Sequence, residues 1–325
     1  MPRRVLLLAA LLTGAAASIV SQEPTFHSQT NAVVIPALVK SAQGEVVYGL
    51  SAKDFIVEDD GVEQSVRLDE AAEGSPLSVV VAIQCGRRAN YEFPHIRGLS
   101  AMLNPLIEAE RGKVAIVEFD SEVRLVQDFT GNSDRIAAAL KELQSGDAGA
   151  AIVDAIDFSL KLLEKAPKER TRVLLLISET RDHGSQTKLE DVVAEIGQSN
   201  TAVYALAFSP ARSNIHDTFE GNNLDEMSTD MNLLALGYQI AQAMRKNAPK
   251  AVAGMTGGED ELFATRKTFD SRMVDFTNHL RSRYVLSIEP KSPHPGLHQI
   301  RVRLRDPADR VVLARGRYWA VGAAK

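Results

Sequence analysis

Cysteine and tryptophan are scarce in this sequence, and it has no excess of positive charge. Its 325 residues include one cysteine and one tryptophan, and aromatic residues make up 6% of the chain. A single cysteine excludes an internal disulfide and a thiolate metal cluster. The formal net charge of −5 argues against electrostatic capture of nucleic acid, and the low aromatic content argues against a base-stacking platform. The rest of the composition, 45% hydrophobic and 24% charged, is typical of a globular protein with room for about two domains.

Beyond the N-terminus, no apolar run reaches the length of a membrane span. The N-terminus itself has two arginines, an apolar stretch over residues 5–20, and the small residues Ala15 and Ala17 in an A-x-A pattern. This is the organisation of a secretory signal peptide. The alternative is an uncleaved anchor, for which the stretch is short compared with the ~20 residues of a span. We expect a signal peptide over 1–21, no membrane span after its cleavage, and a secreted or periplasmic protein.

Both ends of the remaining chain show the alternation and turns of antiparallel strands. Residues 32–39 form an apolar strand in which Pro36 favours an edge or a bulge. Asp59-Asp60-Gly61 is a strong hairpin signal. Residues 300–305 alternate apolar side chains with arginines, which predicts one buried and one solvated face; an anionic partner for the arginine row is the less simple interpretation. We expect residues 22–75 and 283–325 to pack together as a small antiparallel β-domain.

Residues 76–282 follow a different pattern, in which buried strands alternate with helices. Apolar runs at 77–83, 173–177 and 202–208 are typical of strands covered on both faces. Residues 114–129 predict a hairpin at a sheet edge. Helical periodicity predicts helices over 96–106, 133–143 (capped by Ser133), 152–163, 189–196, 233–244 and 269–276, and 209–230 is polar, as expected of a loop. This alternation predicts a doubly wound, mostly parallel α/β sheet flanked by helices.

The order of these elements resembles that of a von Willebrand factor type A domain. The flanks, with Asp59-Asp60-Gly61 before the domain and Gly296-x-His298-x-Ile300 after it, are similar to a bacterial group of secreted relatives. The resemblance implies a Rossmann-like fold and protein binding at a rim formed by three loops at the carboxyl ends of the strands. In the family, these loops hold a divalent cation through D-x-S-x-S, a threonine and an aspartate, whose oxygens suit Mg²⁺.

Most of these ligands are missing here. With the first loop aligned on residues 82–86, Ala82 stands in place of the aspartate, while Ala150 replaces the threonine and Glu179 the third-loop aspartate. We therefore expect no metal and no cofactor. A guanidinium–carboxylate pair could replace the cation, formed by Arg87 or Arg88 with Glu179; ordinary exposed charges are the alternative. The predicted partner-binding rim comprises Gln84, Cys85, Arg87, Arg88, Glu179, Arg181 and Asp182.

Catalysis has little support in the sequence. It contains no nucleophile elbow, P-loop, dinucleotide fingerprint or H-E-x-x-H motif. His294 and His298 lie four residues apart, but in a Pro/Gly loop, which argues against a zinc site. Cys85 with His183 is the only nucleophile–base pair that can be constructed, and a buried structural cysteine is the simpler interpretation.

We therefore expect a non-enzymatic, extracytoplasmic protein-binding or adhesion module that binds a protein partner and no small-molecule substrate. The alternatives are a scaffold subunit of a cell-envelope assembly that uses the β-domain and, more remotely, a Cys85-dependent enzyme.

Overall fold

The computed structural model describes residues 32–69, 76–87, 89–96, 98–108, 112–208, 233–291 and 294–320. All of them lie in one compact unit, Asn31–Lys325. The predicted signal peptide, Arg88 and the predicted loop over 209–230 lie outside the described residues. Within the described ranges, no helix has both the length and the apolar character needed to cross a membrane.

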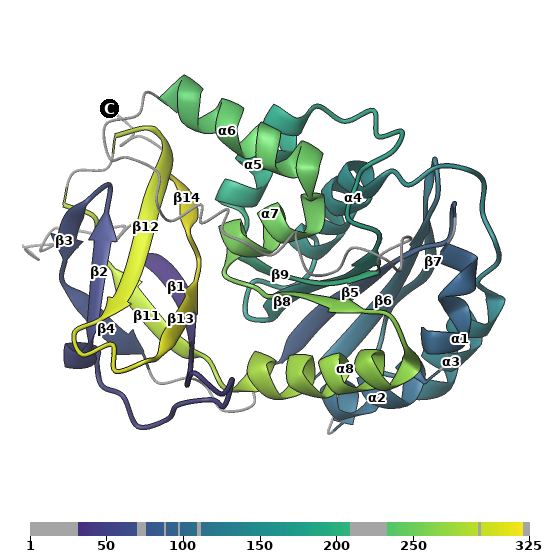
Figure 1. Ribbon diagram of the computed structural model, residues 1–325, viewed down its shortest axis with the longest axis horizontal. Helices are drawn as coiled ribbons and strands as arrows, with labels where there is room; N and C mark the ends of the chain where they lie inside the picture. Colours follow the sequence, from purple (N-terminus) through teal and green to yellow (C-terminus); the bar gives the residue numbers. More distant parts are fainter. Residues whose placement is uncertain are drawn as a thin grey trace, which may run out of the picture. The chain divides into compact units, whose positions relative to one another are not determined.

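A six-stranded sheet in the order β10-β9-β8-β5-β6-β7 forms the centre of the α/β part (Figure 1). Its neighbours are parallel except for β6 and β7, which form the expected antiparallel hairpin at the sheet edge. Every residue of β5 and β9 is buried, since helices cover both faces. The strands are β5 (Leu77–Gln84), β6 (Gly112–Phe119), β7 (Val123–Thr130), β8 (Thr171–Ser178), β9 (Thr201–Phe208) and β10 (Asp260–Phe263).

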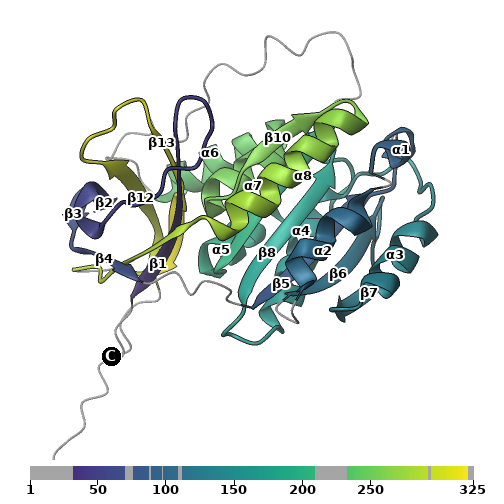
Figure 2. The ribbon, with the colours of Figure 1, turned by 90° about the horizontal axis from the view of Figure 1, so that it is seen from below.

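Helices α1, α2, α3 and α8 cover one face of this sheet, and α4 to α7 cover the other (Figures 1 and 2). Alternate residues of β5 enter the two cores, Val79 and Val81 on one side and Val80 and Ala82 on the other. The fold class predicted from the sequence is confirmed. The helices are α1 (Phe93–Ile96), α2 (Leu99–Ile107), α3 (Ser133–Glu142), α4 (Ile152–Glu164), α5 (Leu189–Gln198), α6 (Leu233–Lys246), α7 (Ala248–Thr256) and α8 (Arg266–Arg281).

Three local expectations need correction. The helix predicted over 96–106 is interrupted, because α1 ends at Ile96 and α2 begins at Leu99. The cap of α3 is Asn132, whose side chain accepts hydrogen bonds from the N–H groups of Asp134 and Arg135, and Ser133 is the first helical residue. Helix α7 was not predicted, because its small residues show no clear apolar stripe. It is capped by Asn247 and packs against β9, in the hydrophobic core that it shares with α4, α5 and α6.

The terminal strands form two four-stranded antiparallel sheets, in the orders β13-β1-β11-β4 and β14-β12-β2-β3, which share one hydrophobic core. Strand β1 is an interior strand of its sheet, although Pro36 favoured an edge or a bulge. Its pairing with β13 ends at Ala37, so Pro36, which has no N–H to donate, faces no β13 residue. The strands are β1 (Val33–Lys40), β2 (Phe55–Asp59), β3 (Val62–Gln64), β4 (Val66–Asp69), β11 (Tyr284–Ile288), β12 (Gly296–Leu304), β13 (Val311–Ala314) and β14 (Arg317–Ala320).

The arginine row of β12 meets acidic side chains of the neighbouring hairpin. Arg303 forms an ion pair with Glu58 of β2, and Arg305 lies 3.8 Å from Glu63 of β3. The side chains of Arg303 and Arg305 are 51% and 62% exposed. The row therefore forms a solvated strand face with local charge pairing, and it does not require an anionic partner.

Candidate functional site

Four loops meet at the carboxyl ends of β5, β6 and β8, and we call this surface the rim. They are residues 85–87 after β5, 120–122 between β6 and β7, 143–151 before α4, and 179–188 after β8. Backbone bonds join them: Gly146 donates to the carbonyl of Cys85, Arg87 to that of Asp147, and Ala150 and His183 exchange two bonds of 2.8 Å. Parallel neighbouring strands bring these loops together, as the fold predicted.

Gln84 and Glu179 connect the first and third loops below the surface. Gln84 Oε1 accepts a 2.8 Å hydrogen bond from the backbone N–H of Glu179, and Gln84 Nε2 lies 3.2 Å from Glu179 Oε1. The same carboxylate oxygen lies 2.8 Å from Nε of Arg87. The Glu179 side chain is 5% exposed and that of Arg87 36%. The carboxylate is thus buried against an amide, and a guanidinium covers it from the solvent side.

The predicted guanidinium–carboxylate pair is therefore confirmed for Arg87, while Arg88 lies outside the described residues. The alignment on Ala82 is wrong. Ala82 lies inside β5, paired with Val117 and Leu176 and packed in the core. The strand-end residue that faces the third loop is Gln84. Because side chains alternate across a strand, Ala82 has the same facing as Gln84 but lies two residues deeper in the sheet.

Among the described residues, this donor set does not fit the divalent cation of the family. The oxygen of Gln84 already accepts from a backbone N–H, and its NH₂ group points at Glu179. Arg87 offers only N–H donors. A cation held here needs several free oxygens, and Glu179 supplies the one carboxylate of this trio.

Asp182 and Arg181 occupy the third loop in different ways. Asp182 Oδ1 accepts from the backbone N–H of Val153 at 3.0 Å and from Ser185 Oγ at 2.6 Å, so it caps the first turn of α4. Asp154, in the first turn of α4, accepts hydrogen bonds from the backbone N–H groups of residues 186 and 187 in the same loop. Arg181 is exposed and has no hydrogen bond or ion pair to the described residues. Asp182 is therefore structural, and Arg181 is presented to solvent.

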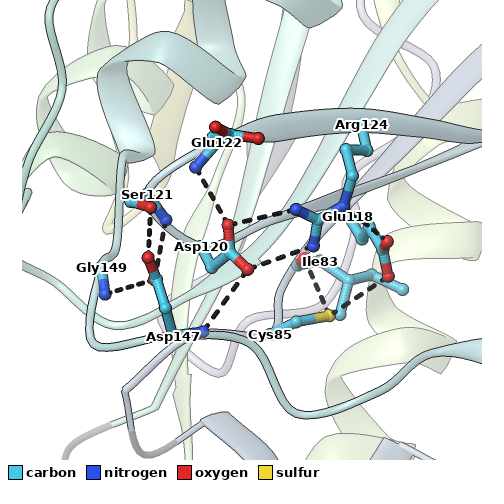
Figure 3. Close-up of polar contacts among 9 residues, drawn as sticks. All are labelled: Ile83, Cys85, Glu118, Asp120, Ser121, Glu122, Arg124, Asp147 and Gly149. Atoms are coloured by element: carbon cyan, nitrogen blue, oxygen red, sulfur yellow. Dashed lines mark hydrogen bonds and ion pairs between the residues drawn. The ribbon is translucent and has the colours of Figure 1, made fainter.

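Two further carboxylates, which the sequence analysis missed, organise the rim. Asp120 accepts from the Glu122 N–H at 2.9 Å and from Arg124 at 3.1 Å, and Asp147 accepts from the N–H groups of Ser121 and Gly149 and from the hydroxyl of Ser121 (Figure 3). Burial opposes ionisation of Asp120, but the Glu122 and Arg124 donors bring its pKa below the usual value. The Ser121 hydroxyl and the Gly149 N–H lower the pKa of Asp147.

These contacts need glycine at tight positions. A Cβ on Gly149 would lie 2.4 Å from the Ser121 nitrogen, and one on Gly146 would lie 2.5 Å from Asp120 Oδ2. The spacing of glycines around Asp147 was the available sequence signal for this packing. The carboxylates of Asp120 and Asp147 thus already accept hydrogen bonds from neighbouring residues.

Cys85 is buried beside this cluster. Its Sγ lies 3.6 Å from the Ile83 carbonyl and 4.0 Å from Glu118 Oε2 (Figure 3). Burial, reinforced by the negative charge of Glu118, raises the pKa of the thiol to about 12. Because the thiolate is the reactive form, this environment suits a structural cysteine and disfavours a nucleophile. His183, its proposed base, lies exposed on the third loop.

Comparison with known proteins identifies the region that carries the rim. Residues 94–181 match the sequence profile of the von Willebrand factor type A domain. A comparison with curated proteins finds no significant match.

Three solved structures of bacterial proteins are similar to parts of this chain. The conserved hypothetical protein BatB from Bacteroides thetaiotaomicron is 13% identical, with 63% of this chain and 99% of that chain covered and a TM-score of 0.43. An aerotolerance-related membrane protein from Bacteroides fragilis is 13% identical over 62% and 98%, with a TM-score of 0.43. The vWF domain of the type V pilus tip protein Mfa5 from Porphyromonas gingivalis is 14% identical over 33% and 39%, with a TM-score of 0.30.

The profile match runs from α1 through β6, β7, α3, α4 and β8 to the third loop, and so includes Glu179 and Arg181. Together with the mostly parallel sheet and its two helical layers, the match supports the resemblance of this region to a von Willebrand factor type A domain that the sequence indicated.

Proposed function

We propose that the chain is a non-enzymatic, extracytoplasmic protein-binding module whose rim recognises an acidic side chain of a protein partner without a divalent cation. The supporting observation is the ion pair between Arg87 and the buried carboxylate of Glu179. In this proposal residues 76–282 form the binding domain, and residues 22–75 and 283–325 form the β-domain beside it.

Arg87 is suited to present part of its guanidinium to a partner. Only Nε is used toward Glu179, and among the described residues neither η nitrogen has a hydrogen-bond partner. The backbone N–H of Arg87 is bound to the Asp147 carbonyl at 2.6 Å, so the residue is fixed from its main chain as well as from its side chain. Its φ of 55° is an uncommon left-handed conformation for a residue with a side chain.

A partner carboxylate would complete this arrangement. The two η nitrogens form a planar fork that matches the two oxygens of a carboxylate. Arg181, exposed on the neighbouring loop, adds a second positive charge. In the family as the resemblance describes it, a metal ion bridges the rim to an acidic residue of the partner. Here a fixed guanidinium serves as the positive group.

The test uses selected peptides. A random peptide library displayed on phage is selected on the untagged protein in EDTA, and the enriched peptides are measured by calorimetry. We expect enriched peptides to share an Asp or Glu, and we expect Arg87→Ala to weaken their binding by about tenfold or more, as for the loss of a charged hydrogen bond. The control is Arg135→Ala, an exposed arginine on α3, which should bind like the wild type.

Metal dependence provides the second readout. Peptide binding and the melting temperature of the EDTA-treated protein should both be the same with and without added Mg²⁺. Binding that needs Mg²⁺, or enriched peptides without an acidic residue, would contradict the proposal.

A further inference from the structure

A cluster of imidazoles and carboxylates lies in the two antiparallel sheets formed by the chain ends, which we call the β-sandwich. None of its residues belongs to the rim. Asp60 is at the turn between β2 and β3, His294 precedes β12, and His298 lies within β12. Asp60 Oδ2 is 2.8 Å from His298 Nδ1 and 3.4 Å from His294 Nε2, and the three potential ligand atoms all lie within 4.8 Å of one another. The sequence analysis argued against a zinc site at His294 and His298 because they lie in a Pro/Gly loop, and it did not consider Asp60 as a neighbour.

A second carboxylate faces the same nitrogen. Asp59 Oδ1 lies 3.2 Å from His298 Nδ1. The side chains of Asp59 and His298 are 8% and 2% exposed, whereas those of Asp60 and His294 are 39% and 64% exposed. Asp59 and His298 therefore form the buried side of the cluster, and Asp60 and His294 form its solvent-exposed side, from which an ion can enter.

The orientation of His298 is fixed by its other nitrogen. Nε2 lies 2.7 Å from the backbone carbonyl of His294, which can only accept, so Nε2 carries a hydrogen. In the neutral ring, Nδ1 then directs its lone pair at two carboxylates. This arrangement requires a positive charge between them, supplied by a proton or by a metal ion.

The position of His294 favours the metal ion over the proton. A proton on Nδ1 would be satisfied by the two carboxylates alone and needs no second imidazole. His294 Nε2 nevertheless approaches the same oxygen of Asp60, at 3.4 Å. The His294 ring also stacks on that of His298, with centroids 4.2 Å apart and planes 24° apart, so it must turn out of the stack for both nitrogens to direct their lone pairs at one ion; its exposed side chain allows this rotation. A single ion between these atoms explains why all of them converge.

Three of the separations among these ligand atoms are close to those around a small tetrahedral ion, and the two imidazole nitrogens lie within 4.8 Å of each other. Ligand atoms at the usual zinc distances of about 2.0–2.2 Å are about 3.4 Å apart around a tetrahedron. The separations of 3.2 Å and 3.4 Å match this value, and the 2.8 Å separation would open by about half an ångström. The exposed side chains of Asp60 and His294 can make that adjustment.

Two of the four candidate ligands are also held by residues outside the cluster, and His298 is held by the main chain of His294. Asp60 Oδ1 accepts the backbone N–H of Gln299 at 2.9 Å, Asp59 Oδ2 accepts the Tyr318 hydroxyl at 3.1 Å, and His298 Nε2 donates to a carbonyl. Such outer contacts orient the ligands of metal sites in proteins.

We propose that Asp60, His294 and His298, with Asp59 as a fourth ligand, form a binding site for a zinc-type divalent ion. Two imidazoles with carboxylates favour Zn²⁺ over Mg²⁺ or Ca²⁺, which prefer oxygen ligands alone. The ion would join the β2–β3 turn to the segment before β12, two parts of the sandwich from opposite ends of the sequence. This inference is independent of the function proposed for the rim.

The experiment titrates untagged, EDTA-treated protein with ZnCl₂ in a calorimeter and with Co²⁺ as a spectroscopic probe. We expect one ion per chain with micromolar affinity or tighter, and visible Co²⁺ absorption of tetrahedral intensity that Zn²⁺ abolishes. His294→Ala should weaken Zn²⁺ binding at least tenfold, while its melting temperature in EDTA stays that of the wild type, because the side chain is mostly exposed.

Two further variants make the result specific. Asp60→Asn keeps the left-handed turn, since asparagine tolerates a positive φ, and should also weaken binding. His183→Ala removes an exposed histidine of the rim and should leave binding unchanged. The proposal is overturned if Zn²⁺ does not bind, if His294→Ala binds as tightly as the wild type, or if His183→Ala removes the site instead.

Discussion

Replacing Arg87 by methionine would leave the carboxylate of Glu179 without its guanidinium. The Glu179 side chain is 5% exposed and would retain the amide of Gln84 as its side-chain donor. Breaking a fully buried ion pair by removing one partner costs roughly 3–5 kcal/mol. Because the Arg87 side chain is 36% exposed, solvent reaches the pair, and we expect Arg87→Met to lower the free energy of unfolding by about 2 kcal/mol.

A double-mutant cycle measures the interaction itself. Glu179→Gln keeps an oxygen for the Gln84 amide and removes the charge, which should cost about 1 kcal/mol. The double variant should cost less than the sum of the two single variants, with a coupling energy of about 1–2 kcal/mol. Urea unfolding at pH 7, followed by circular dichroism, provides the four free energies.

The chain offers a matched control in Arg67 and Glu289. Their charged atoms are also 2.8 Å apart, but the side chains are 61% and 51% exposed. Arg67→Met and Glu289→Gln should show a coupling energy below about 0.5 kcal/mol, as exposed pairs do. If the rim cycle gives a coupling energy no larger than this control, the buried-pair argument is refuted.

Three other predictions concern groups whose pKa values are shifted in the folded protein. Because the pKa of Cys85 is raised to about 12, a thiol reagent at pH 8 should label the denatured protein at once and the native protein far more slowly; equal rates would contradict this. Burial and then Asp157 raise the pKa of Glu195 to about 7, so the folded state binds this proton more tightly than the unfolded state, and stability falls as pH rises from 4.5 to 7. Glu195→Gln should therefore raise the melting temperature at pH 8 and leave it unchanged at pH 4. Burial opposes ionisation of Glu259, but hydrogen bonds from His279 and then Lys40 lower its pKa to about 2, so its contribution is complete above pH 4.5 and is lost as pH falls through 2. Lys40→Met should destabilise the protein at pH 7, and the difference in urea midpoint should shrink toward pH 2; a constant difference would refute this assignment.

Much of the secondary structure was predictable because it depends on local patterns. Strands β5, β8 and β9 are continuous apolar runs, as strands covered on both faces must be. The turn after β2 was predictable because Asp60 and Gly61 both adopt positive φ, which that residue pair favours. Helix α7 was missed, although Asn247 followed by Pro249 in the first turn is a helix-start signal.

The candidate site was predictable only in part. The pair of Arg87 with Glu179 followed from placing two loops at one sheet edge, but the alignment on Ala82 was two residues too early. A run of apolar residues shows that a strand is present but not where it ends, so the residue facing the next loop was undetermined. The cap that Asp182 forms on α4 was not predicted, because only the folded loop brings the Val153 N–H to it.

The sequence by itself determined the doubly wound sheet, the flanking antiparallel strands and the resemblance to von Willebrand factor type A domains. These depend on apolar periodicity and turn residues, which act over a few positions along the chain. Only the tertiary structure decided which polar side chains meet: Gln84 with Glu179 at the rim, and Asp60 with His294 and His298 in the sandwich. The physical reason is that a side chain's hydrogen-bond partners depend on distance in space, and those partners lie about 95 to more than 230 residues away in the sequence.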